Sequence, residues 1–91
     1  MRGVTKTCRV ADAMTSLADD LLDEKRYGDS LYAKYQAQDL LVEYHSKWEE
    51  AHHDYQHITS TAGYTEAELA AAFAAEKLTY ANWVTMRAIA E

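Results

Sequence analysis

Residues 30–57 read SLYAKYQAQDLLVEYHSKWEEAHHDYQH, a stretch without glycine or proline in which apolar residues recur at intervals of three and four. This spacing is typical of an amphipathic α-helix, and at 1.5 Å per residue such a helix extends about 42 Å. Its main apolar stripe consists of Ala33, Ala37, Leu40, Leu41, Tyr44, Trp48, Ala51 and Tyr55, with Ile58 directly after it. We therefore expect this helix to be the spine of the fold.

A first helix is predicted on the N-terminal side, over residues 7–27. Its apolar residues, which repeat at helical spacing, are Val10, Met14, Leu17 and Leu21. Gly28 follows two basic residues at the expected end of this helix, a combination typical of a helix C-terminus, and Asp29 can cap the next helix. A single helix kinked at Gly28 fits the same pattern.

A third helix is predicted on the C-terminal side, after a loop over residues 58–64. It begins at Thr65, because Thr65 and Glu68 form a capping box in which each side chain bonds to the backbone N–H of the other residue. The helix continues to about residue 90. The apolar residues that share one side of it are Leu69, Phe73, Tyr80 and Val84.

Composition favours an all-α fold. The 91 residues include 16 alanines, three glycines and no proline, so the turn residues that many-stranded sheets need are missing. A chain of this length has room for one domain. We expect a single three-helix domain over residues 1–91, in which the second and third helices form a long antiparallel hairpin and the first helix packs across it. Residues 1–6 are expected to be a flexible basic arm.

Charge and cysteine content restrict the partners and the compartment. Fifteen acids against nine bases give a net charge of −6, which would repel a phosphate backbone and argues against direct nucleic-acid binding. No apolar run approaches the roughly 18 residues that cross a bilayer, so no membrane partner is expected. Cys8 is the single cysteine, and residues 1–9 lack the apolar core of a signal peptide. These features predict a cytoplasmic protein.

The second and third helices carry more apolar surface than one packing face holds. In the second helix, Leu31, Tyr35 and Val42 lie on a different side from the main stripe, and in the third helix Leu78 and Ile89 lie opposite the Phe73 side. Helices that are apolar on several sides are buried on several sides. The predicted interface residues are Leu31, Tyr35, Val42, Leu78, Trp83 and Ile89. Their partner is a second copy, in a homodimer or higher oligomer, or another protein; alternatively, the first helix covers this surface.

Two groups of polar residues are candidate sites. His45, Glu49 and His52 share one side of the second helix and contain a Glu-x-x-His pair, which di-metal helical bundles use together with carboxylates from facing helices. The alternatives are a hydrogen-bonded polar border or a pH-sensitive interface, and no cofactor is predicted. The residues of an acidic docking face that could occupy a basic groove are Asp12, Asp19, Asp20, Asp23 and Glu24. The alternative is a solvated surface.

The sequence contains no glycine-rich phosphate loop, no paired zinc-ligand cysteines and no Gly-x-Ser-x-Gly motif, so no enzymatic reaction is indicated. We expect a small acidic protein-binding module without enzymatic activity, a regulator or inhibitor that docks on a larger macromolecular machine. A viral or mobile-element inhibitor of host machinery, such as an anti-CRISPR type protein, fits this size and composition. The alternatives are a metal-binding helical oligomer and a structural subunit of an assembly.

Overall fold

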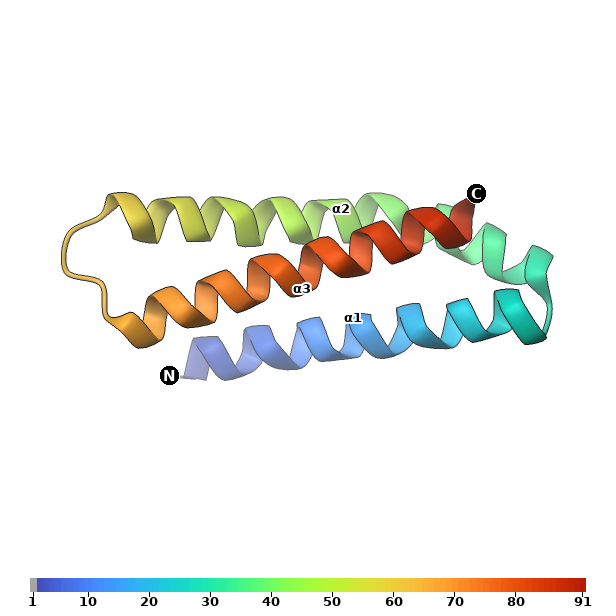
Figure 1. Cartoon of the computed structure of the whole chain (residues 1–91), viewed down its shortest axis with the longest axis horizontal. Coiled ribbons are helices and arrows are strands. Elements are labelled where there is room, and N and C mark those ends of the chain that lie inside the picture. Colours follow the sequence, from blue (N-terminus) through green and yellow to red (C-terminus); the bar gives the residue numbers. More distant parts are fainter. Residues whose placement is uncertain (1) are drawn as a thin grey trace.

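The computed structural model describes the backbone of residues 2–91 and the side chains of residues 12–91. These described residues form three helices, α1 (Arg2–Tyr27), α2 (Ser30–Ser60) and α3 (Glu66–Ala90). Helices α2 and α3 form an antiparallel hairpin with the most extensive packing, and α1 contacts both of them (Figure 1). The all-α, three-helix fold expected from the sequence is confirmed.

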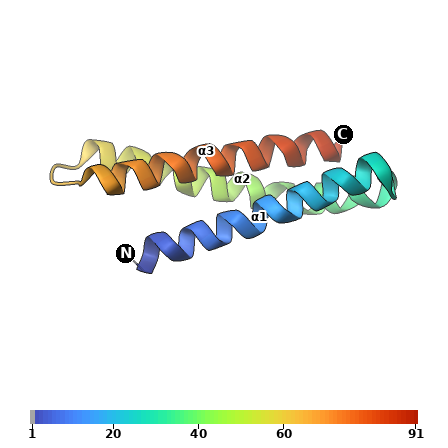
Figure 2. The same cartoon turned by 60° about the horizontal axis from the view of Figure 1, so that its bottom comes forward.

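The first helix is longer than the sequence analysis predicts. It begins at Arg2 rather than near residue 7, so the backbone of residues 2–6, where a flexible arm is expected, is helical. No proline interrupts this segment, and each residue added to an existing helix gains a backbone hydrogen bond. Met1 and the side chain of Cys8 lie outside the part of the chain that is described. The helix axis is inclined to the hairpin, and its N-terminal end stands apart from α2 and α3 (Figure 2).

The connection between α1 and α2 is a true break. The backbone N–H of Gly28 still donates to Glu24 O at 2.9 Å, while the N–H of Asp29 donates to the Glu24 carboxylate at 2.9 Å. Asp29 in turn caps α2, because its side chain accepts from Tyr32 N at 3.0 Å. A Cβ on Gly28 would lie 2.5 Å from Glu24 Oε1. Glycine at this position therefore leaves room for the carboxylate that ends α1.

The core lies where the three helices meet. Its buried apolar residues are Ala18, Leu21, Ala33, Ala37, Tyr44, Met86 and Ile89. The methyl side chains of Ala33 and Ala37 are fully buried, so the neighbouring helices approach α2 closely. The Tyr44 hydroxyl donates to Met14 O at 2.7 Å and joins α2 to α1. Burial, and secondarily the charge of Glu43, raises the pKa of Tyr44 to about 12.

The buried side of α3 differs from the side that hydropathy predicts. Thr79 and Asn82 face inward and are buried, whereas Phe73, Tyr80 and Val84 are exposed. Both buried polar side chains are satisfied, since Thr79 Oγ1 donates to Ala75 O at 2.7 Å and Asn82 Nδ2 donates to Thr15 Oγ1 at 2.9 Å. Hydrogen bonding thus removes the cost of burying them. The apolar side predicted for the third helix lies at the edge of the hairpin, partly exposed and partly in contact with rings of α2.

The last turn of α3 is held by side chains of the other two helices. Lys25 Nζ donates to Ala88 O at 2.8 Å and to Ile89 O at 2.9 Å, and Gln38 Nε2 donates to Ala90 O at 3.1 Å. These carbonyls have no partner within the helix, and the lysine charge is favourable at the negative end of the helix dipole. Among the described residues, no helix is both long and apolar enough to cross a membrane.

Candidate protein-binding surfaces

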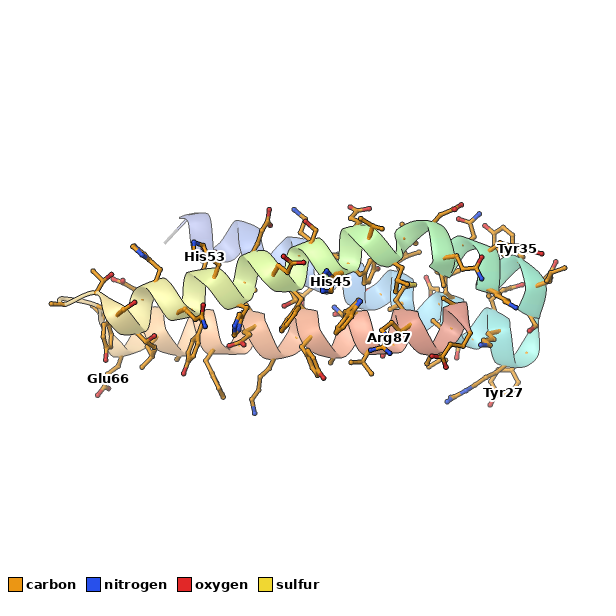
Figure 3. The ribbon with its side chains drawn as sticks, turned by 90° about the horizontal axis from the view of Figure 1, so that it is seen from above. Tyr27, Tyr35, His45, His53, Glu66 and Arg87 are labelled. Carbon is orange, nitrogen blue, oxygen red and sulfur yellow. The ribbon has the colours of Figure 1, made fainter. Side chains whose placement is uncertain are left out.

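Three apolar side chains form a row on the outer side of α2, and we call Leu31, Tyr35 and Val42 the outer row. They are spaced by four and seven residues, so they lie on one face of the helix, opposite the buried alanines. Their exposed fractions are 58%, 56% and 79%. Tyr35 is labelled near the N-terminal end of α2 in Figure 3. Neither α1 nor α3 covers this row.

The other three predicted interface residues, all on α3, are more covered. Leu78 and Trp83 are half-buried, and Ile89 is fully buried. Ile89 belongs to the core together with Ala18 and Leu21 of α1. The first helix therefore covers Ile89, as the alternative interpretation of the sequence expects, whereas Trp83 packs on Trp48 of α2 and the outer row of α2 stays open.

The outer side of α3, where the predicted apolar residues Phe73, Tyr80 and Val84 lie, is a second partly exposed apolar surface, although the rings of Phe73 and Tyr80 also contact Tyr55 and Trp48 of α2. Phe73, Tyr80 and Val84 are each more than two-fifths exposed. The buried residues of α3 are Thr79, Asn82, Met86 and Ile89, in which Thr79 and Met86, and likewise Asn82 and Ile89, are seven residues apart. Because two of the four are polar, a search for apolar residues alone does not find this buried side.

Aromatic rings fill the seam between α2 and α3. The indoles of Trp48 and Trp83 stack with their centroids 5.6 Å apart. His45 lies 4.8 Å from Trp83, and Tyr80 lies 5.6 Å from Trp48, between ring centroids. The Arg87 guanidinium carbon is 5.1 Å from the centroid of Trp83. Figure 3 shows His45 and Arg87 along this seam, with α1 behind it.

The histidines of the seam pair with separate carboxylates. His45 Nδ1 lies 2.6 Å from Glu49 Oε1, one turn along α2, and His52 Nδ1 lies 2.6 Å from Glu76 Oε1 of α3. The residues proposed as ligands, His45, Glu49 and His52, thus engage two different pairs. Within the described residues, no group of three or more histidine, cysteine or acidic side chains is placed to hold a metal ion.

Most of the predicted acidic face is on the surface of α1. Asp12, Asp19, Asp20 and Asp23 are exposed. Glu24 differs, because it is half-buried and its carboxylate accepts the N–H of Asp29. Its role is to end α1, whereas the four aspartates remain available to a partner.

The fold and these surfaces define a three-helix bundle that presents apolar side chains on two outer faces and carboxylates on a third. No protein-family model, curated protein or solved structure matches the chain.

Proposed function

We propose that this protein is a small, non-enzymatic protein-binding module and that the outer row of α2 is its contact surface. The exposure of Leu31, Tyr35 and Val42 on one helix face is the observation that supports this proposal. Single exposed apolar side chains are common on protein surfaces, whereas several on one helix face mark a candidate interaction site. Two further tyrosines close to the α1–α2 connection, Tyr27 and Tyr32, are also exposed. Tyrosine is enriched in protein interfaces.

The proposed role is that of a regulator or inhibitor that docks on a larger macromolecular machine. The chain has a net charge of −6, which suits an acidic ligand of a basic surface. Exposed aspartates on α1 would steer it toward a basic surface and make association faster at low salt. A viral or mobile-element inhibitor of the anti-CRISPR type is the specific form of the role that this size and charge favour.

The structural-subunit alternative uses the same outer row with identical chains as the partner. The metal-binding alternative has less support, because His45 and His52 contact different glutamates.

Affinity capture from extracts of the encoding organism tests the proposal. Wild-type protein is compared with the double variant Leu31→Glu/Val42→Glu, which places two carboxylates in the outer row. The matched control is His53→Glu/Gln56→Glu, which adds two carboxylates at exposed positions of the same helix beyond the row. Circular dichroism establishes that all three proteins are equally helical.

A partner recovered in stoichiometric amount by the wild type and the control, and at least about tenfold less by the row variant, supports the proposal. Equal recovery by all three proteins contradicts it.

A further inference from the structure

The outer side of α3 combines exposed aromatic and aliphatic groups with positive charge. Lys77 Nζ lies 4.7 Å from the ring centroid of Phe73, and Arg87 lies over Trp83 at 5.1 Å. Tyr80 and Val84 are exposed between these two cations. Contact with a ring face restrains each long side chain, so both charges are held near the helix surface.

This face carries two cations although the whole chain is acidic. Glu76 is the single acid in residues 69–90, and its side chain is 20% exposed and paired with His52. Among the side chains of residues 12–91, the ion pairs are His45–Glu49, Lys47–Glu50 and His52–Glu76. Lys77 and Arg87 therefore keep their charges free for a carboxylate from another molecule.

The chain itself displays a matching row of carboxylates on α1. Asp12, Asp19 and Asp23 are exposed and, at spacings of seven and four residues, lie on one helix face. At 1.5 Å per residue, Asp12 and Asp23 are separated by about 16 Å along α1, and Lys77 and Arg87 by about 15 Å along α3. The two rows have opposite charge and nearly equal length.

We propose that the outer face of α3 binds the aspartate row of a second copy of this chain. The helices pair antiparallel, with Lys77 near Asp23 and Arg87 near Asp12 of the other copy, and with Tyr80 packing between them. Helices α1 and α3 run in the same direction within one chain (Figure 1), so the contact sets two copies antiparallel. The α3 face points away from α1, which packs on the Asn82 and Ile89 side, so each copy keeps one free face for a further copy. The outer row of α2 takes no part in this contact, but the contact uses the same α1 aspartates that steer the chain toward a partner in the proposed function.

A charge-exchange experiment tests this pairing. Sedimentation velocity measures the mass of the wild type, of Lys77→Glu/Arg87→Glu, of Asp12→Lys/Asp19→Lys/Asp23→Lys, and of an equimolar mixture of the two variants. In the mixture, the reversed α3 of one chain meets the reversed α1 of the other, and the two remaining faces, one α1 and one α3, retain their original charges. Circular dichroism checks that each variant is folded.

Two control variants separate the specific contact from the effect of net charge. Lys34→Glu/Lys47→Glu has the same net charge as the α3 variant, and Asp39→Lys/Glu50→Lys/Asp54→Lys has the same net charge as the α1 variant. All these control positions are on α2.

The proposal expects a mass of two or more chains, increasing with concentration, for the wild type, the controls and the mixture, and one-chain mass for each charge-reversed variant alone. One-chain mass for the wild type at millimolar concentration overturns it, as does a mixture that stays monomeric or a reversed variant that dimerises as well as the wild type. Every charge-reversed variant retains Leu31, Tyr35 and Val42. Affinity capture of a foreign partner through the outer row is therefore a separate measurement from self-association.

Discussion

Trp48 of α2 and Trp83 of α3 stack across the hairpin, with centroids 5.6 Å apart and ring planes within 7° of parallel. At this separation the rings are offset rather than directly superposed, an arrangement that aromatic pairs favour. His45 and Tyr80 contact the same pair. The stack lies on the side of the hairpin that α1 does not cover. It fixes the register of α2 against α3, and α2 is the helix that carries the outer row.

Replacing Trp83 by alanine is expected to lower the free energy of unfolding by about 2 to 3 kcal/mol, less than for a fully buried tryptophan because Trp83 is half-buried. Urea denaturation monitored by circular dichroism measures the change. Tyr27→Ala is the control, since Tyr27 is 84% exposed, and it should change stability by less than about 0.5 kcal/mol. Equal effects of the two substitutions would show that the stack does not stabilise the hairpin.

Alkaline pH should destabilise the protein through Tyr44. Its pKa rises from 10.0 to about 12 on folding, so between these values the unfolded chain releases a proton that the folded chain retains. Stability is complete below pH 10 and falls as the pH rises toward 12, by roughly 2 to 3 kcal/mol in total. Denaturation midpoints measured at intervals between pH 8 and 12 test this dependence.

The Tyr44→Phe variant isolates this contribution. It should be about 1 to 2 kcal/mol less stable than the wild type near neutral pH, because Met14 O loses its hydrogen bond. Above pH 10 the difference between the two proteins should shrink. A constant difference across the whole range would mean that Tyr44 does not cause the alkaline loss.

Lys25→Met should destabilise the end of the bundle by about 1 to 2 kcal/mol, because two carbonyls of α3 lose a charged donor. Methionine keeps the length of the side chain and removes its charge. Hydrogen exchange should accelerate for the last turn of α3 more than for its middle. Lys47→Met serves as the reference, because Lys47 makes only a surface contact with Glu50 at 3.5 Å and should matter by less than about 0.5 kcal/mol. Uniform exchange along α3 would contradict the proposed role of Lys25.

Features set by local chemistry were predictable from the sequence. The main stripe of α2 is the inward side of that helix. Its alanine and aromatic residues recur at helical spacing and form one apolar face, and burying this face removes it from water. Thr65 caps α3 and accepts from Glu68 N at 3.1 Å, as one half of the capping box requires. The break after Tyr27 follows from Gly28 and the Asp29 cap.

Features set by contacts between helices were not predictable in the same way. The burial of Thr79 and Asn82 depends on hydrogen bonds, one of which joins α3 to Thr15 of α1. Hydropathy assigns polar residues such as these to the surface, so it does not identify the side of α3 that is buried. The burial of Ile89 likewise depends on where α1 crosses the hairpin, which the periodicity of a single helix does not determine.

Site-specific photocrosslinking at Val42 tests the central claim most directly. A photoreactive phenylalanine replaces Val42, which is 79% exposed, and in a parallel sample it replaces Asp54, an exposed residue of α2 beyond the outer row. After irradiation in the organism that encodes the protein, we expect a discrete adduct from position 42 that Leu31→Glu abolishes, and no such adduct from position 54. Indistinguishable patterns at the two positions would show that the outer row of α2 is not a binding surface.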